Sequence, residues 1–247
     1  MTLKQIAQIP ASQGTADIAA RVRLIRQRIE SASRRVGRSP DEVTLMAVTK
    51  TQPAPKILAA YEAGLRCFGE NRVQEFAAKV EKLSGLRGAT VALIGQLQSN
   101  KVNRAIELFS AIHSVDSLRL AQRLNAAIER AGRDPIPITI EINTGDPAKA
   151  GLVPDSSELE QLLASAERLP HIRIQGLMTL PPFTEDPEGA RPYFRRLCHL
   201  RDTIAGGRFS GLDMKVLSMG MSHDFEVAIE EGSTCVRIGS AIFGERS

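Results

Sequence analysis

The sequence predicts an α/β fold in which eight parallel β-strands, each followed by a helix, close into a single TIM barrel with an additional N-terminal helix. Two observations support this prediction. Short apolar, β-branched runs alternate with longer helical stretches, and such alternation favours parallel strands joined by right-handed crossovers. Eight such units in 247 residues match the usual size of a TIM barrel. A doubly wound open sheet is the alternative. Since no composition break marks a linker, we expect residues 1–247 to form one domain.

The first element is a helix expected over residues 17–37, after residues 1–15, which we expect to be loosely ordered. At helical spacing it carries an apolar stripe of Ile18, Val22, Ile25, Ile29 and Val36. Its other faces are rich in arginine, which indicates a solvated basic surface. We therefore expect an amphipathic helix that packs on the outside of the barrel. An organellar transit peptide, also rich in arginine and poor in acids, is the alternative.

The remaining elements alternate as the barrel requires. Each strand is assigned to a short run of apolar and β-branched residues, and each helix to the longer stretch that follows it. The strands are expected at 43–48, 66–69, 91–95, 111–115, 138–143, 174–178, 215–219 and 235–239. The helices between them are expected at 55–64, 70–83, 100–108, 117–131, 157–169, 188–204 and 225–231. Ser117 is a suitable N-cap for the helix that begins there.

The charge balance raises the question of nucleic acid binding. The net charge is +4, the isoelectric point is near 9.1, and most of the basic residues are arginines. Aromatic residues make up only 4% of the chain, and no basic stretch is interleaved with aromatics as single-strand binding requires. A solvated basic surface therefore explains the charge, and we expect no nucleic acid partner.

The sequence composition also indicates the cellular compartment in which the protein is expected. No apolar run approaches the roughly 18 residues that a membrane span requires, and the N-terminus lacks the apolar stretch of a secretory signal. Cys67, Cys198 and Cys235 lie far apart in sequence, which fits neither a disulfide framework nor paired metal ligands. The histidines likewise show no ligand spacing. We therefore expect a cytoplasmic protein with no membrane contact and no metal site.

Familiar catalytic motifs do not occur in the sequence. Residues 95–101, GQLQSNK, have the first glycine and the lysine of a P-loop, but Asn100 replaces the second glycine and Val102 replaces the serine or threonine. The sequence also lacks GxGxxG after a strand, GxSxG and HExxH. His113 falls inside a predicted strand, where a histidine is more often a hydrogen-bonded core residue than a ligand. Candidate residues must therefore come from the fold.

Lys50 is the first candidate, because it directly follows the first predicted strand. The active site of a TIM barrel lies at the carboxyl ends of its strands, so this lysine is expected at the barrel mouth. Burial of a lysine amine lowers its pKa and makes it a usable nucleophile. A lysine whose side chain simply reaches solvent at a strand end is an equally good interpretation of the position alone.

The last two strand ends could hold a phosphate. TIM barrels commonly bind phosphate between the loops after the seventh and eighth strands. Here Gly239 and Ser240 open a helix whose backbone N–H groups could face a dianion, and Ser222 could add a hydroxyl from the neighbouring loop. An ordinary strand–helix turn is the alternative for Gly239 and Ser240. Arg237 lies inside the eighth strand, where its charge requires an acceptor within the barrel.

A lysine amine and a phosphate cradle together describe a site for a phosphorylated aldehyde. Pyridoxal 5′-phosphate (PLP) has the required aldehyde and phosphate, and its pyridine nitrogen would need a protein partner. Sugar-phosphate aldolases use the same two features, so the residues alone leave both classes open.

Five stretches of the sequence resemble the pyridoxal phosphate homeostasis protein family, whose barrel is of the alanine racemase type. They are AVTKTQP at 47–53, FGENRVQE at 68–75, IGQLQSNK at 94–101, GLMTLPP at 176–182 and LSMGMSHDFEVAIEEGSTCVRIGSAIFG at 217–244. The resemblance covers essentially the whole chain after the N-terminal segment, and its last stretch is long and highly specific.

The resemblance implies a role for each candidate residue. Lys50 would bind PLP as a Schiff base, Arg237 would face the pyridine nitrogen, and Asn71 would lie beside the ring. The phosphate would be held by Ser222, Gly239 and Ser240. The family is implicated in intracellular PLP supply and amino-acid balance, without an established catalytic turnover. The implied ligands are PLP and other B6 vitamers, and the implied partners are apo-enzymes that receive PLP.

Two positions depart from the family pattern. The usual aromatic–histidine pair before Ile-Gly of the third strand is Val91-Ala92 here, which leaves Lys50 and Arg237 untouched but changes the local packing. The loop over residues 143–151, NTGDPAKAG, is one residue shorter than usual and lacks a glutamate before Lys149. The sequence therefore leaves open any role of this loop in cofactor exchange.

A non-catalytic PLP carrier and a PLP-dependent amino-acid racemase are the competing interpretations, and a sugar-phosphate lyase is a third. Arginine keeps its proton, so Arg237 would donate to a neutral pyridine nitrogen, which is a weaker electron sink. Racemases of this fold tolerate such an arginine, yet they need a second base, a tyrosine from an added β-domain. Tyr61 and Tyr193 both fall in predicted helices away from the strand ends. We therefore favour the carrier, and we expect a monomer because the basic first helix offers no self-complementary apolar patch.

Overall fold

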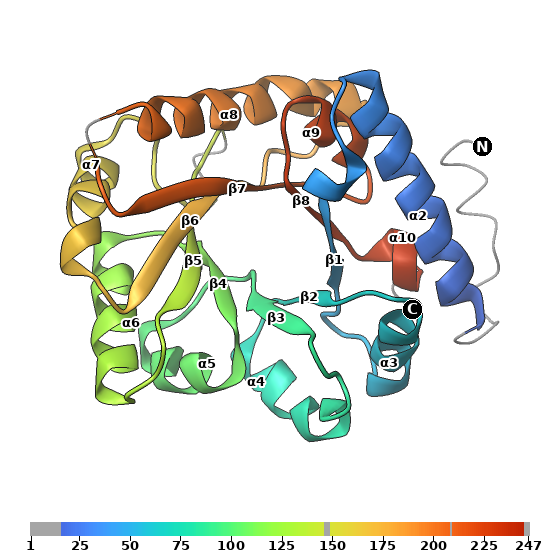
Figure 1. Ribbon diagram of the computed structural model, residues 1–247, viewed down its shortest axis with the longest axis horizontal. Coiled ribbons are helices and arrows are strands. Elements are labelled where there is room, and N and C mark those ends of the chain that lie inside the picture. The colour runs from blue at the N-terminus through green and yellow to red at the C-terminus, as the bar shows by residue number, and fades with distance from the viewer. Residues whose placement is uncertain (1–15, 146–148, 208, 245–247) are drawn as a thin grey trace.

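The computed structural model describes residues 16–145, 149–207 and 209–244. In this part of the chain, eight strands form one closed parallel barrel in sequential order (Figure 1). The first strand closes the barrel by pairing with the last, with Thr44 opposite Cys235. This closure confirms the predicted TIM barrel and excludes the open sheet. The expectation of loose order for residues 1–15 lies outside the described residues.

All eight strands lie at the predicted apolar runs; β4 has the predicted bounds, and the other seven have shifted ends. They are β1 (Thr44–Val48), β2 (Cys67–Glu70), β3 (Thr90–Leu93), β4 (Ala111–Val115), β5 (Ile136–Glu141), β6 (Ile172–Met178), β7 (Leu212–Met221) and β8 (Cys235–Ile238). The largest difference is in β7, where Leu212 still pairs with Ile174 and Met221 still pairs with Arg237. Pairing with both neighbours therefore sets strand ends that the apolar pattern does not mark.

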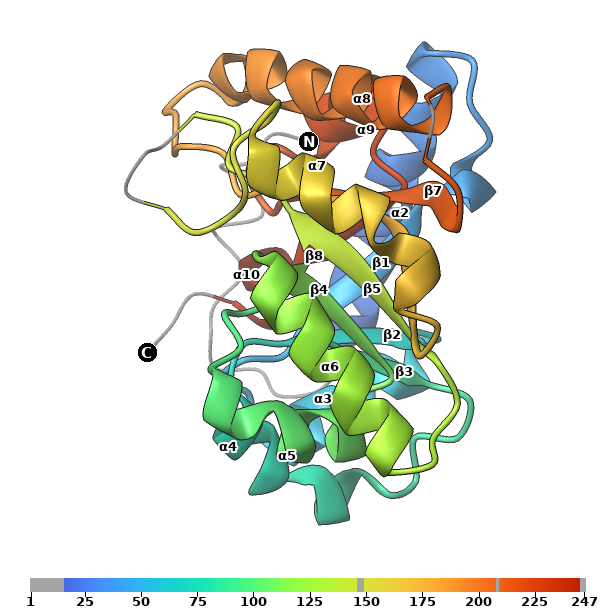
Figure 2. The same cartoon turned by 90° about the vertical axis from the view of Figure 1, so that its left-hand side faces the viewer.

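Helices follow the strands and cover the outside of the barrel (Figure 2). They are α2 (Ala16–Arg35), α3 (Ala54–Glu62), α4 (Val73–Ala77), α5 (Val102–Leu108), α6 (Leu118–Arg130), α7 (Ser157–Ala164), α8 (Arg191–Ala205), α9 (Phe225–Glu230) and α10 (Ser240–Phe243). The Ser117 hydroxyl accepts a hydrogen bond from the Leu120 N–H at 3.2 Å, so Ser117 caps α6 as predicted. No helix within the described ranges has both the length and the apolar character that a bilayer crossing requires.

The helix expected over residues 70–83 is wrong at its start and in its middle. Glu70 is instead the last residue of β2, and its side chain is buried. The α4 helix covers only Val73–Ala77, and a separate 3₁₀ turn covers Val80–Leu83. The backbone leaves helical angles at Lys79, whose φ is −120°. The helical apolar pattern misses this break because Lys79 is held by contacts to residues that precede α4.

The α2 helix packs on the barrel as predicted and lies beside α9 and α10 (Figure 1). Val36, expected in its apolar stripe, follows the helix end and is 41% exposed. The basic face is only partly solvated, because Arg28 forms an ion pair with Glu226 and Arg35 forms one with Glu230 of α9. The buried part of the stripe consists of Ile18, Val22, Ile25 and Ile29.

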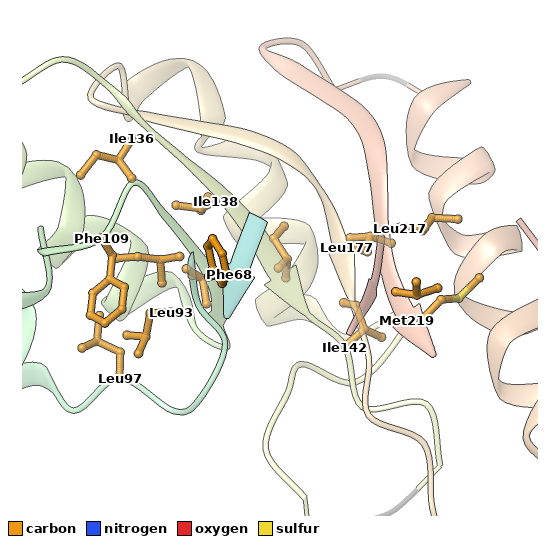
Figure 3. Close-up of a cluster of buried hydrophobic side chains, with 14 of the residues drawn as sticks. Phe68, Leu93, Leu97, Phe109, Ile136, Ile138, Ile142, Leu177, Leu217 and Met219 are labelled. Carbon is orange, nitrogen blue, oxygen red and sulfur yellow. The ribbon is translucent and has the colours of Figure 1, made fainter. Parts of the chain in front are cut away.

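Two layers of apolar side chains fill the fold. The larger layer lies between the strands and the helices and includes Phe68, Leu93 and Leu177 (Figure 3). The smaller layer lies inside the barrel and consists of Met46, Val48, Ala92, Ile94 and Cys235. Side chains along a strand alternate between the two faces of the sheet. Every second residue from a member of the smaller layer therefore also faces the barrel interior, and beyond the strand such residues lie at the barrel ends.

A cavity of about 370 Å³ lies at the amino-terminal end of the barrel and is lined by Ala92, His113 and Cys67, among others. Ala92 is the small residue of the Val91-Ala92 pair, so this departure from the family pattern falls at the opposite end from Lys50. His113 is buried as expected. Its Nδ1 nevertheless has no hydrogen-bond partner in the described part of the chain, so the expected hydrogen bonding of this ring is wrong at that atom.

Candidate functional site

The carboxyl ends of β1, β2 and β8 meet at one edge of the barrel. Val48 of β1 pairs with Gly69 of β2, and Ala47 of β1 pairs with Ile238 of β8. Met46 and Val48 face the barrel interior, so Lys50, two residues after Val48, lies on the same side of the chain. The residues that follow these three strands therefore converge at the barrel mouth.

A cavity of about 330 Å³ occupies this mouth, within the range of small-molecule sites. Its lining includes all six candidate residues from the sequence, which are Lys50, Asn71, Ser222, Arg237, Gly239 and Ser240. Leu180, Met221 and His223 line it as well, and the sequence did not single these out. The fold thus brings together residues from near both ends of the chain.

Lys50 is partly buried and follows β1 directly. The next residue, Thr51, has a φ of +62°, a left-handed backbone angle that is uncommon for a β-branched residue. Such a conformation persists only where surrounding contacts hold it. The turn that carries Lys50 is therefore a constrained segment.

Arg237 has the acceptors inside the barrel that its burial requires. It is 3% exposed, and its guanidinium donates to the Ser218 backbone carbonyl at 2.5 Å and to the Ser218 hydroxyl at 2.8 Å. A third hydrogen bond runs to the Thr179 carbonyl at 2.7 Å. Burial lowers the pKa of Arg237, yet a guanidinium keeps its proton in proteins. The side chain is therefore a fixed cationic donor on the cavity wall.

Backbone N–H groups and a hydroxyl meet at the start of α10. The Ser222 Oγ accepts hydrogen bonds from the Gly239 N–H at 3.3 Å and from the Ala241 N–H at 3.4 Å. Ser240 is exposed and begins the helix. These long hydrogen bonds leave donors that a phosphate oxygen could bind more closely.

Asn71 lies at the end of β2, and its side-chain Oδ1 is buried without a hydrogen-bond partner among the described residues. A side chain at Gly95 would collide with the Asn71 backbone, so glycine at this position allows the two loops to touch. Buried polar atoms normally have partners. An unpartnered oxygen on a residue that lines the cavity fits a site that receives a polar ligand.

Glu141, which the sequence analysis did not single out, is buried at the end of β5. Burial raises the pKa of its carboxyl to about 7, the negative charge of Asp116 adds to the effect, and Arg237 opposes it. Burial lowers the pKa of His113 to about 4, and the positive charge of Arg237 adds to this effect. A glutamate that ends a run of β-branched residues was the signal that could have identified this group.

The two tyrosines occupy different surroundings. Tyr61 donates its hydroxyl to the Arg87 carbonyl at 2.8 Å, outside the cavity. The Tyr193 ring packs directly on Gly145, in the loop that follows β5. The expectation that both lie away from the strand ends is therefore wrong for Tyr193, because the start of α8 packs against this loop. Neither tyrosine lines the cavity.

The loop after β5 is described in part, since residues 146–148 lie outside the described ranges. The Asn143 amide donates to the Lys149 carbonyl at 2.8 Å. The Lys149 ammonium in turn donates to the Pro181 carbonyl at 2.8 Å, in the loop that follows β6. These bonds join the two loops beside the cavity.

Comparison of the chain with known proteins identifies its family. Residues 21–247 match the family described as alanine racemase, N-terminal domain. The chain is 43% identical to the pyridoxal phosphate homeostasis protein of Aquifex aeolicus (strain VF5) over 229 residues, which cover 92% of this chain and 97% of that protein.

Solved structures agree with these sequence matches. PipY of Synechococcus elongatus PCC7942, solved with PLP bound, is 36% identical with a TM-score of 0.78, over 92% of this chain and 100% of that chain. Alanine racemase from Streptomyces coelicolor A3(2) is 18% identical with a TM-score of 0.70. The likeness covers 94% of this chain and 59% of the racemase, which shows a shared fold and a longer racemase chain.

Proposed function

Since this chain belongs to the pyridoxal phosphate homeostasis protein family, we propose that it holds PLP reversibly and buffers or delivers it within the cell, with an effect on amino-acid balance. The observation that carries the proposal is a single cavity lined by Lys50, Arg237 and Ser222, whose Oγ accepts a hydrogen bond from the Gly239 N–H. An amine for an aldehyde and donors for a phosphate are what this ligand requires.

Each candidate residue has one task in this proposal. Lys50 would hold PLP through its side-chain amine, and the aldehyde that PLP supplies would allow a covalent bond to that amine that water can reverse. Arg237 donates to the pyridine nitrogen, and Asn71 offers its unpartnered oxygen beside the ring. The phosphate binds to Ser222, Gly239 and Ser240.

A carrier is favoured over an amino-acid racemase by two features of the cavity. Arg237 is held by three hydrogen bonds and keeps its proton, so it cannot protonate the pyridine nitrogen. Neither Tyr61 nor Tyr193 lines the cavity, so neither can serve there as the second base that a racemase needs. Glu141 titrates near neutrality but does not line the cavity either.

The proposal also covers the cellular compartment, the oligomeric state and the binding partners. Cys67, Cys198 and Cys235 are free thiols, which supports a reducing, cytoplasmic compartment. The apolar stripe of α2 is buried against its own barrel, which supports a monomer. Other B6 vitamers that carry the phosphate would share the cavity, and apo-enzymes that lack PLP would receive it.

The test is an absorbance spectrum of the protein with PLP, recorded before and after borohydride, followed by peptide mapping. We expect absorbance in the visible range and a reduced adduct on Lys50. Lys50→Ala should lose the adduct, whereas Lys56→Ala in α3 is the matched control. An unchanged spectrum in Lys50→Ala refutes the assignment. Turnover of L-alanine or L-serine to the D-form would replace the carrier with the racemase.

A further inference from the structure

A lysine and two glutamates form a cluster behind the turn that carries Lys50. The Lys79 ammonium contacts the Glu70 carboxylate at 2.7 Å and the Glu75 carboxylate at 3.1 Å. It also donates to the Thr49 backbone carbonyl at 2.9 Å. None of these side chains lines the cavity at the barrel mouth. The cluster therefore contacts the site only through the backbone that carries Lys50.

The cluster holds the peptide groups on both sides of Lys50. On one side, the Thr49 carbonyl is bound by Lys79, and the Thr49 hydroxyl donates to Glu70 at 2.5 Å. On the other side, the Thr51 N–H donates to the Glu75 carboxylate at 2.5 Å. Fixing both peptide planes fixes the direction in which the Cα–Cβ bond of the residue between them points. The left-handed backbone of Thr51 is thereby held in place.

Stability alone gives a weak reason for these charges. Glu70 is fully buried, and Lys79 keeps only 11% of its side chain exposed. Burial raises the pKa of the Glu70 carboxyl, and Lys79 opposes the effect. Buried ion pairs are often replaceable by well-packed apolar residues without loss of stability. Apolar residues could not form the hydrogen bonds that Lys79 and Glu75 make to the two peptide groups that flank Lys50.

We propose that Lys79 and Glu75, with Glu70, are positioning residues that aim the Lys50 amine at the aldehyde of the bound cofactor. The inference rests on the proposed function and adds the residues that determine its covalent step. It predicts a selective effect. Ligands that bond covalently to Lys50 should depend on the cluster, whereas ligands held only by the phosphate and ring contacts should not.

The test compares PLP with pyridoxine 5′-phosphate, which carries an alcohol in place of the aldehyde. Glu75→Ala removes the acceptor of the Thr51 N–H at a partly exposed position and leaves Lys79 paired with Glu70. We expect its dissociation constant for PLP to rise about 10- to 100-fold, the range expected from a misplaced reacting group. Its affinity for pyridoxine 5′-phosphate should stay within about twofold of wild type. Glu81→Ala, an exposed glutamate in the next turn, is the matched control.

A second readout needs no cofactor. Amide hydrogen exchange at Thr51 should be faster in Glu75→Ala and in Lys79→Met, and Lys79→Arg should restore part of the protection. If Lys79→Met does not fold, Glu75→Ala decides the outcome alone. Wild-type PLP affinity in folded Glu75→Ala, or equal weakening of both ligands, overturns the inference. Absence of a borohydride-stable adduct in the wild-type protein would instead overturn the proposed function.

Discussion

Burial shifts the pKa values of two groups of the barrel, His113 and Glu141, in opposite directions, and replacing each group in turn should separate their effects on stability. The pKa of His113 is lowered from 6.5 to about 4, and that of Glu141 is raised from 4.5 to about 7. Since one pKa unit corresponds to about 1.4 kcal/mol, each group links roughly 3 kcal/mol of folding free energy to pH. Both groups are sensitive to the charge of Arg237.

The direction in which each group changes the folding stability with pH depends on whether the folded or the unfolded state binds its proton more tightly. His113 has a lowered pKa in the folded protein, so its contribution is present above about pH 6.5 and is lost as the pH falls to about 4. Glu141 has a raised pKa, so its contribution is present below about pH 4.5 and is lost as the pH rises through about 7. Between about pH 4.5 and 6.5 the two slopes offset each other in the wild-type protein.

The assay is urea unfolding of wild type, His113→Phe and Glu141→Gln at a series of pH values. Relative to wild type, His113→Phe should gain about 3 kcal/mol as the pH falls from about 6.5 to 4. Glu141→Gln should gain a similar amount as the pH rises from about 4.5 to 7. His199→Phe, at an exposed position, is the matched control. A His113→Phe profile parallel to that of wild type would refute the reasoning.

Three further predictions concern the site and its frame. Ser222→Ala should weaken PLP binding about tenfold in a fluorescence titration, since one of the hydrogen bonds proposed for the phosphate is lost, and wild-type affinity would place the phosphate elsewhere. Gly220→Ala should lower the free energy of unfolding by at least about 2 kcal/mol in urea, because its φ is +91° and a Cβ would collide with Ala228. A stability within about 0.5 kcal/mol of wild type would contradict this. A double-mutant cycle on Arg28 and Glu226 should give a coupling of about 0.5–1 kcal/mol, and zero coupling would mean that the pair does not fasten α2.

The fold could be predicted from the sequence because its signals are local. The run before Lys50 is short and apolar, so it indicates a strand on its own residues, and the eight repeats of this pattern define the barrel. The positions of Lys50 and Gly239 at strand ends then follow from parallel topology. The sequence predicts that Arg237 has hydrogen-bond acceptors, since a buried charge needs them. It does not identify these acceptors as Ser218 and Thr179.

The rest of the site depends on distances between residues far apart in sequence. The sequence predicts a helix that begins at Glu70, whereas pairing of β2 with β3 and the ammonium of Lys79 bury this residue at a strand end. The pKa of Glu141 depends first on burial and then on Asp116 and Arg237, which come from other strands or strand ends. The unpartnered Nδ1 of His113 likewise reflects what surrounds β4 rather than its own sequence.

The adjacency of β1 and β8 has a consequence for biosynthesis. A ribosome releases Lys50 early and Arg237 late, and during that interval the nascent polypeptide holds one wall of the proposed PLP site without the other. Tertiary contacts of a domain complete only when its last strand is available. If the proposed site is correct, PLP is captured only by polypeptides whose synthesis has passed β8, and prematurely terminated products would carry Lys50 without the groups proposed to hold its ligand.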